Sequence, residues 1–374
     1  MISVQIILPR LIIRMKIKSY IMTVIIMMTV ITSCRQQGKE QVSPLEDTTS
    51  FKELKGERIL SDYPFVFPQS LLSTGNGLIV GDARTETLLL AFDSLNDSTP
   101  IGIGARGMGP DEFMNRRCMY YNAHDSVLYI HDTVLRRAKY FKYDESRPEL
   151  TGANTVREIS LRDSRANDTR PAGELLVTDL VSGNTMFALV DSTGSVRSRF
   201  GIYPGDKSGI EDSTSFAMAH QTILTVNTAG DRAVVAGRNS DWLAFYEISD
   251  DGGRLITESM TFESPVEVLS EEDGDTRTVS TRDLADTRTC FTDLIATPRY
   301  VYAVYSGSTA KEREDKTAKP MCVLKYDWNG TFIEGFRFAE QTGAKTVTPD
   351  DRFIIAVTQG DKDEMILKQF ELSN

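Results

Sequence analysis

The chain has 374 residues, with 42 basic and 53 acidic side chains and a formal net charge of −11. A protein this acidic has no electrostatic footprint for nucleic acid, and anionic membrane surfaces repel it. Its length allows one large β domain or two ordinary domains.

The N-terminal stretch Met15–Cys34 predicts export. Lys16 and Lys18 form a short positive region, Tyr20–Ile31 is almost wholly apolar, and the sequence ITSC closes the run. The apolar run is shorter than the about 20 residues of a transmembrane helix, and the order is that of a secretory signal with a small-residue cleavage site. The closing residues resemble a bacterial lipobox. The resemblance implies cleavage before Cys34 and a diacylglyceryl thioether on it, with fatty acyl chains such as palmitate. An ordinary secretory signal that ends in cysteine and an uncleaved anchor are the alternatives.

Residues 1–33 are therefore assigned to the signal peptide, with Met15 as the expected true start, and residues 34–50 to a lipidated tether. The tether has almost no apolar residues and no periodicity, so we expect it to be disordered. Arg35 and Gln36 follow the cysteine without the acidic run that directs some lipoproteins to the cell surface. This favours the periplasmic side.

From residue 51 onward the sequence predicts strands. Runs rich in Val, Ile, Phe and Tyr end at Asp, Gly, Ser or Asn, and no segment shows a capped helical periodicity. An apolar strand that ends in Asp recurs at spacings of 51, 47, 59 and 77 residues, at Asp93, Asp144, Asp191, Asp250 and Asp327. A period near 50 with four strands per unit is typical of a propeller blade. The fold class is therefore all-β, a six-bladed β-propeller of four-stranded antiparallel blades over residues 51–374. Two stacked sandwiches are the structural alternative.

The six blades are expected at 68–103, 117–161, 168–201, 219–262, 289–338 and 343–374. The last of these has room for three strands only. Phe51–Ile59 precedes the first blade without a partner of its own. We expect it to supply the missing outer strand and close the ring, which removes exposed sheet edges.

The long insertions are expected mostly on one face. In a four-stranded meander, the loops between strands two and three and the loops between blades open on the same side. The insertions of these two classes are 104–116, 202–218, 263–288 and 306–319, whereas 144–154 opens on the other side. Long loops on a rigid face commonly carry function, so we expect a protein or glycan partner there. Tolerated surface insertion explains the highly charged segments 263–288 and 306–319 equally well.

Gly102–Gly107 matches the dinucleotide fingerprint G-x-G-x-x-G, but no helix or βαβ unit accompanies it, so we reject that interpretation. The glycines favour a wide turn that leaves the first blade, from which Phe113 returns to the core. The candidate interaction residues of this turn are Arg106, Gly107, Gly109, Pro110, Asp111, Glu112 and Phe113.

The run G-x-x-G-x-G-P-x-E-F in this turn resembles the TolB-like six-bladed β-propeller lipoproteins of Bacteroidetes. The lipobox, the linker after it and the sequence FGIYP at 200–204 fit the same family. The resemblance implies a six-bladed propeller anchored in the outer membrane. It supplies no catalytic residues.

The remaining reactive side chains indicate no particular chemistry. Besides Cys34, the cysteines are Cys118, Cys290 and Cys322, at no metal-ligand spacing. We expect three free thiols, because Cys290 and Cys322 fall on the first and third strands of the fifth blade, too far apart for a disulfide. The histidines, His124, His131 and His220, accompany no catalytic motif.

We therefore expect no catalytic residue, no metal and no cofactor. The predicted function is a binding or scaffold module in the periplasm, held to the outer membrane by its N-terminal lipid. The alternative is a carbohydrate- or lactone-directed propeller enzyme with a metal in the central channel.

Overall fold

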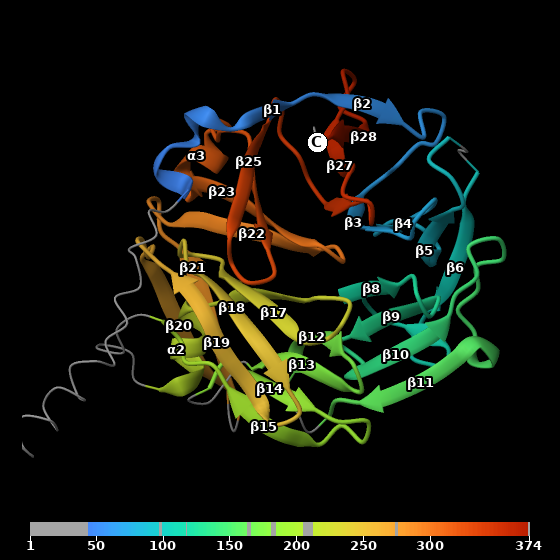
Figure 1. The fold of residues 1–374 in the computed structure, drawn as a ribbon, viewed down its shortest axis with the longest axis horizontal. Helices are drawn as coiled ribbons and strands as arrows, with labels where there is room; N and C mark the ends of the chain where they lie inside the picture. The colour runs from blue at the N-terminus through green and yellow to red at the C-terminus, as the bar shows by residue number, and fades with distance from the viewer. Residues whose placement is uncertain are drawn as a thin grey trace, which may run out of the picture. The chain divides into compact units, whose positions relative to one another are not determined.

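The computed structural model describes residues 44–96, 99–116, 118–162, 166–180, 185–204, 212–273 and 276–372. These residues form six sheets of four or five strands arranged as a ring, each built around four antiparallel strands, and a separate two-stranded hairpin (Figure 1). The predicted all-β, six-bladed propeller is confirmed. The signal segment, Cys34 and the tether up to residue 43 lie outside the described residues. Within the described chain, no helix is long and apolar enough to cross a membrane.

The first three blades hold strands β3 to β15. Their bounds are β3 (Pro68–Ser73), β4 (Leu78–Asp82), β5 (Thr87–Phe92), β6 (Ile101–Arg106), β7 (Glu112–Phe113), β8 (Cys118–Asn122), β9 (Val127–Asp132), β10 (Arg137–Lys142), β11 (Thr155–Ser160), β12 (Ala166–Ala172), β13 (Leu175–Leu180), β14 (Phe187–Val190) and β15 (Val196–Phe200). The first blade is β3 to β7, the second β8 to β11 and the third β12 to β15.

The last three blades hold most of the later strands. Their bounds are β16 (Thr222–Val226), β17 (Arg232–Gly237), β18 (Leu243–Ser249), β19 (Gly252–Ser259), β22 (Arg288–Ala296), β23 (Tyr300–Thr309), β24 (Cys322–Asp327), β25 (Phe332–Phe338), β26 (Lys345–Val347), β27 (Phe353–Gln359) and β28 (Met365–Glu371). Cys290 and Cys322 lie on β22 and β24 with β23 between them, and both are free thiols, as predicted.

Burial on both faces explains why the strands read as continuous apolar runs. The first strands of neighbouring blades contact one another around the ring and line its centre. Second strands such as β4, β9 and β17 are buried along almost their whole length, because a neighbouring blade covers each face of the sheet. Six clusters of buried side chains fill the six spaces between neighbouring blades, including the space between the last blade and the first. The ring is thus closed by packing as well as by strand pairing.

Ring closure by the N-terminal segment is more elaborate than the single strand we predicted. Phe51–Ile59 forms two strands, β1 (Lys52–Leu54) and β2 (Gly56–Ile59). β2 pairs antiparallel with β28 and completes the last blade, whereas β1 pairs parallel with β25 and adds a fifth strand to the fifth blade (Figure 1). The segment therefore spans two blades, with a break between the strands at Lys55.

The end of the expected tether also differs from the prediction. Pro44–Glu46 and Thr48–Ser50 form short 3₁₀ helices, η1 and η2, instead of disordered chain. The Asp47 carboxylate accepts a hydrogen bond from the Thr49 amide at 3.0 Å and caps η2. Leu45 packs against the cluster between the fourth and fifth blades. Residues 44–50 therefore belong to the folded domain.

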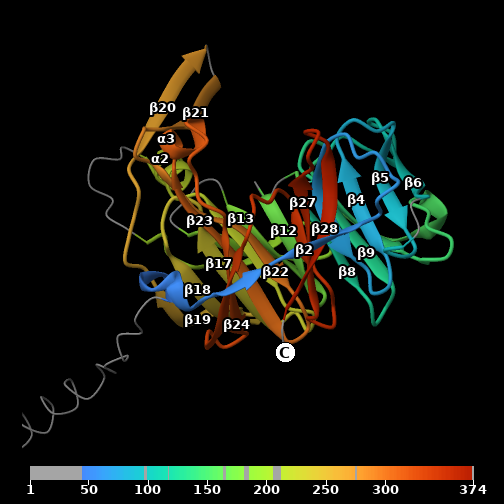
Figure 2. The same ribbon diagram turned by 90° about the horizontal axis from the view of Figure 1, so that it is seen from above.

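The insertions carry short helices and a hairpin that the strand pattern did not predict. These elements are η3 (Gly152–Asn154), α2 (Ser213–Ala219), α3 (Ala310–Glu314) and the two-stranded hairpin β20 (Val266–Asp273) and β21 (Thr276–Asp283). Figure 2 shows the hairpin projecting from the ring of blades, with α2 and α3 near its base.

Candidate functional site

The predicted interaction turn closes on itself after the first blade. Its return strand β7 pairs parallel with β6, so the chain makes a complete loop between Arg106 and Phe113. The Glu112 carboxylate accepts a hydrogen bond from the Gly109 amide at 2.7 Å. Gly107 has φ +155°, and a Cβ there would lie 2.0 Å from the Glu112 Oε2 atom. Glycine is therefore needed at position 107, because the Glu112 carboxylate that binds the turn backbone occupies the space that a side chain there would take.

The same turn braces the first blade against the second. Phe113 is fully buried and packs against Phe141, with ring centroids 5.9 Å apart. Arg137 donates to the carbonyl oxygen of Gly109 at 3.0 Å and also to that of Glu112.

The charged residues of the turn are also engaged with the protein. Lys139 donates to the carbonyl oxygen of Pro110 and lies 3.6 Å from the Asp111 carboxylate. Arg106 donates to two carbonyl oxygens of the loop between β4 and β5, each at 3.2 Å. The contacts of the candidate residues thus serve folding. Met108, which we did not select, is 76% exposed at the tip. A role of the turn in binding stays a prediction.

A second repeated aspartate, missed in the sequence, fixes the entry into three blades. Asp82, at the end of β4, accepts hydrogen bonds from the Val66 and Phe67 amides at 2.9–3.1 Å. Asp132, at the end of β9, accepts one from the Met114 amide at 2.7 Å. Asp179 in β13 accepts one from the Asp168 amide. Asp82 and Asp132 thus satisfy backbone N–H groups just before the first strand of their blades, and Asp179 satisfies one within the first strand of its blade, β12. In the sequence, these aspartates stand at or next to the end of the second apolar strand of each blade. The repeat described above used instead the aspartates that follow the third strand.

The long insertions form one connected platform beside the fourth and fifth blades. α2 packs against both strands of the hairpin, and Arg277 of the hairpin lies 2.6 Å from Asp212 at the start of α2. Hydrogen bonds from the Ser215 amide and hydroxyl and from Arg277 hold the pKa of Asp212 well below its ordinary value.

The base of the hairpin is held by α3. Arg313 pairs with Asp283 at 2.8 Å, and the Lys311 amide donates to the Ala285 carbonyl oxygen at 3.0 Å. Thr309 caps α3 in a capping box with Glu312. The hairpin is thus held near its tip by Asp212, at the start of α2, and at its base by α3. We call β20, β21, α2 and α3 together the platform.

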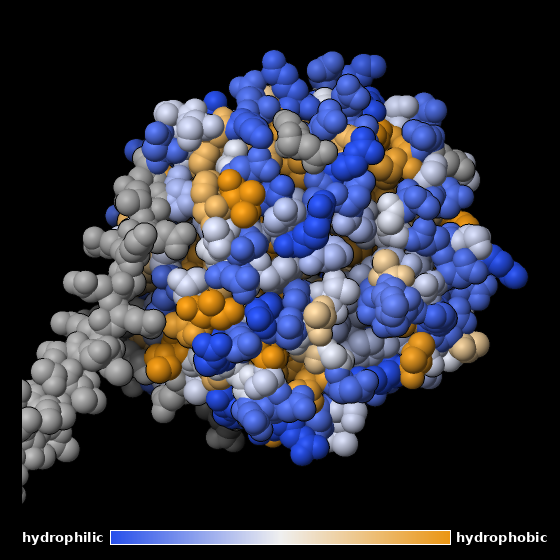
Figure 3. Space-filling view, in the orientation of Figure 1, coloured by the Kyte–Doolittle hydropathy of each residue, from blue (hydrophilic) through white to orange (hydrophobic). Residues whose placement is uncertain are grey.

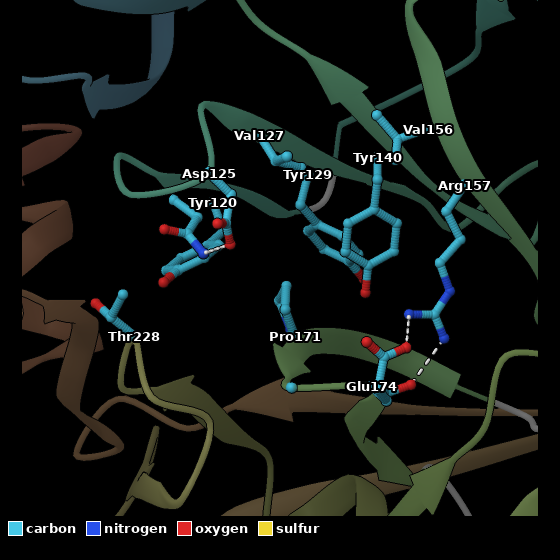
Figure 4. Close-up of a pocket in the computed structure, with 12 residues that line it drawn as sticks. Tyr120, Asp125, Val127, Tyr129, Tyr140, Val156, Arg157, Pro171, Glu174 and Thr228 are labelled. Carbon is cyan, nitrogen blue, oxygen red and sulfur yellow. Dashed lines mark hydrogen bonds and ion pairs between the residues drawn. The ribbon is translucent and has the colours of Figure 1, made fainter.

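A pocket lies at the other end of the blades. It has a volume of about 490 Å³ and opens between the second and third blades, where the loops between first and second strands turn. The residues that line it are Tyr120, Asn122, Asp125, Val127, Tyr129, Tyr140, Val156, Arg157, Pro171, Gly173, Glu174 and Thr228 (Figure 4). Because strands in a meander alternate in direction, this end is opposite to the one that carries the platform.

Three tyrosines from three strands form the aromatic part of the pocket. The rings of Tyr129 and Tyr140 meet edge to face with centroids 5.0 Å apart, and Tyr120 lies across the opening from them (Figure 4). The Tyr129 hydroxyl is hydrogen-bonded to Thr169, and that of Tyr120 to Thr228. The Tyr140 hydroxyl is buried and meets no hydrogen-bond partner within the part of the chain that the structure describes.

Polar side chains stand at the two ends of the pocket. At one end, the Asn122 amide donates to the Asp125 carboxylate at 2.9 Å. At the other, Arg157 donates to the Glu174 carbonyl oxygen at 2.7 Å and lies 3.4 Å from its carboxylate. The Arg157 guanidinium also stacks 5.4 Å from the centre of the Tyr140 ring. None of the pocket residues was selected from the sequence.

Comparison with known families shows which family the chain belongs to. A sequence profile described as TolB-like 6-blade propeller-like matches residues 47–348. The chain belongs to this family. The resemblance inferred from the Gly-Pro-x-Glu-Phe turn is thereby confirmed at the level of the family. No curated protein matches this TolB-like chain.

The TolB-like propeller is similar to several solved structures at low identity. A Bacteroides fragilis NCTC 9343 protein that is named as an exported protein shares 13% identity at a TM-score of 0.49, over 87% of this chain and 99% of that one. The β-propeller domain of Myceliophteria thermophila Cps50 (Swd1) shares 11% at 0.44, over 86% and 100%. The WD40 repeats of RRP9 share 10% at 0.44, over 86% and 100%.

The histidines of the TolB-like propeller lie apart. His124 is exposed, and His131 is fully buried in β9. His220 pairs with Glu263 at 2.7 Å and ends α2. Among residues 44–372, leaving out the gaps given above, no group of three or more His, Cys, Asp or Glu side chains is placed to hold a metal ion. The alternative of a channel metalloenzyme has no ligand set in this described part.

Proposed function

We propose that this protein is an outer-membrane lipoprotein, anchored by a lipid on Cys34 and facing the periplasm, whose propeller is a binding or scaffold module. The lipobox and its short apolar run support export and anchoring. The TolB-like family assignment supports a propeller as the functional body. The acidic composition leaves the lipid as the contact with the membrane.

The observation that carries the binding role is the platform. The hairpin β20–β21 belongs to no blade, yet ion pairs fix it at two levels: Arg277, near its tip, pairs with Asp212 at the start of α2, and Asp283, at its base, pairs with Arg313 of α3. A fixed protrusion loses little conformational entropy when a partner binds it. The hairpin is polar near its tip, with Ser270, Glu271 and Glu272 exposed. On the face of the ring shown in Figure 3, apolar residues are scattered among polar ones. We therefore place a protein or glycan partner with a polar surface at the platform.

Site-specific photo-crosslinking in cells tests this proposal. A photoreactive residue at Ser270 on the hairpin should give one discrete adduct with a partner. The matched control is Asn329, which is exposed on the turn between β24 and β25 at the opposite end of the blades. The same adduct from both positions, or none from Ser270, contradicts binding at the platform.

A further inference from the structure

We propose that the pocket between the second and third blades is a binding site for a neutral saccharide, separate from the platform and from any partner bound there. The volume of about 490 Å³ falls within the 300–1,000 Å³ that is usual for small-molecule sites. The pocket combines aromatic rings with amide, carboxylate, hydroxyl and guanidinium groups. That combination suits a ligand with apolar C–H faces and many hydroxyl groups.

The tyrosines provide the surface for the C–H faces of a sugar ring. Tyr120 is partly exposed and offers its ring to the opening, whereas Tyr140 is covered by Arg157 on its ring and contributes its hydroxyl. Tyr129 is 1% exposed and packs against Tyr140. Tyrosine presents a large apolar ring with a polar tip and few rotatable bonds, so it contributes contact area at low entropic cost. Pro171 and the Cβ-free Gly173 leave the space in front of the rings open, since a Cβ at Gly173 would meet nothing within 4 Å.

The Tyr140 hydroxyl is a polar group at this pocket that the described protein leaves without a partner. It is buried without a hydrogen-bond partner among the described residues, and it points into the space above Glu174 (Figure 4). A buried hydroxyl without a partner is unfavourable. A ligand hydroxyl, which both donates and accepts, would satisfy it in either orientation.

The charges of the pocket select against ions. Asp125 and Glu174 at the two ends oppose an anion. Their side chains are 59% and 97% exposed, and each carboxylate keeps lone pairs for sugar hydroxyls beyond those that Asn122 and Arg157 use. Three tyrosines beside two carboxylates would suit an organic cation. However, Arg157 already covers the Tyr140 ring with its own positive charge. A neutral polyhydroxylated ligand avoids both repulsions.

Ligand-observed NMR with the purified mature chain tests the ligand class. The neutral probes are maltose, cellobiose, lactose and chitobiose, and the charged probes are glucuronate and choline. At least one neutral disaccharide should bind, and glucuronate and choline should not. Binding of a charged probe alone, or of no probe, overturns the proposal.

A pair of matched variants assigns the binding to this pocket. Tyr140→Phe removes one hydroxyl and should weaken binding by about three- to tenfold, the loss expected for one hydrogen bond. Tyr143→Phe makes the same change at a buried tyrosine three residues along, outside the pocket, and should leave the Kd unchanged. Tyr140→Phe should not lower the Tm, because its hydroxyl has no described partner to lose. Equal binding by both variants, or a lower Tm for Tyr140→Phe alone, overturns the assignment.

Discussion

The N-terminal segment Phe51–Ile59 contributes one buried side chain to each of three neighbouring clusters between blades. Truncating the middle one, Leu54, tests whether the segment stabilises the ring. Leu54 is 2% exposed and packs in the cluster between the fifth and sixth blades with Phe336, Phe338 and Phe370. Leu54→Ala removes most of this side chain from a space that cannot fully collapse. Substitutions of this kind cost 2–5 kcal/mol, and we expect about 3 kcal/mol here. For a chain of this size that loss lowers the Tm by on the order of 5 °C.

Urea unfolding followed by tryptophan fluorescence measures this loss. Trp242 and Trp328 are both buried and report on the fourth and fifth blades. Glu57→Ala is the control, because Glu57 is exposed on the adjoining strand β2 and its loss should change stability by less than about 0.5 kcal/mol. If both variants unfold at the same urea concentration, the segment does not clamp the ring as the packing indicates.

Four further outcomes follow from the sequence and the structure. Cys34→Ala should release the protein from the membrane fraction or leave its signal uncleaved, and mass spectrometry of the mature N-terminus should otherwise show a lipidated Cys34. The three other cysteines should titrate as free thiols after unfolding without reductant. Burial raises the pKa of Cys290 from 9.0 to about 12, so the contribution of this thiol to stability should be constant below pH 9 and should be lost as the pH rises from 9 towards 12. Cys290→Ala should make this alkaline loss of stability smaller. Gly107→Ala should lower the free energy of unfolding by about 2–3 kcal/mol, because the alanine would have a positive φ and its Cβ would clash with Glu112. Gly173→Ala also has a positive φ but open space around it, and should lower the free energy of unfolding by about 1 kcal/mol.

The blades could be predicted because each strand and turn shows in its own sequence what the fold requires of it. A strand covered on both faces must be apolar along its length, and the turns between strands need Asp and Gly. Asp191 and Asp327 show this, since each accepts the amide two residues later, and Gly194 and Gly330 follow with positive φ. The order β22, β23, β24 was fixed by the same pattern.

The N-terminal segment was predicted less well because strand pairing depends on the partner. The sequence of Phe51–Ile59 shows one short amphipathic run, and nothing in it tells that Leu54 and Ile59 enter different clusters. Similarly, Leu45 alone anchors the end of the expected tether. One apolar residue in a polar segment does not change its composition enough to predict order.

The pocket could not be predicted because its residues are far apart in the sequence and ordinary in type. Tyr120, Tyr140 and Arg157 lie on three strands of one blade, and Glu174 belongs to the next. A tyrosine on a strand predicts core packing unless the neighbouring blade leaves space in front of it. Conversely, the Gly-Pro-x-Glu-Phe turn was conspicuous in the sequence because glycine and proline mark unusual backbone. These motif residues stabilise the turn itself, as the hydrogen bond from the Gly109 amide to the Glu112 carboxylate shows.

The two ends of the propeller should therefore act independently. Coupling between sites requires an element with two arrangements whose balance both ligands shift. Between the pocket and the platform lie strands that are buried on both faces, packed in clusters that run continuously around the described ring. Close-packed interiors of this kind resist small displacements. Occupation of the pocket by a saccharide should therefore leave the cross-linking yield at Ser270 unchanged, and Tyr140→Phe should leave it unchanged as well. A change in that yield would show that the third and fourth blades move relative to each other, against the packing described here.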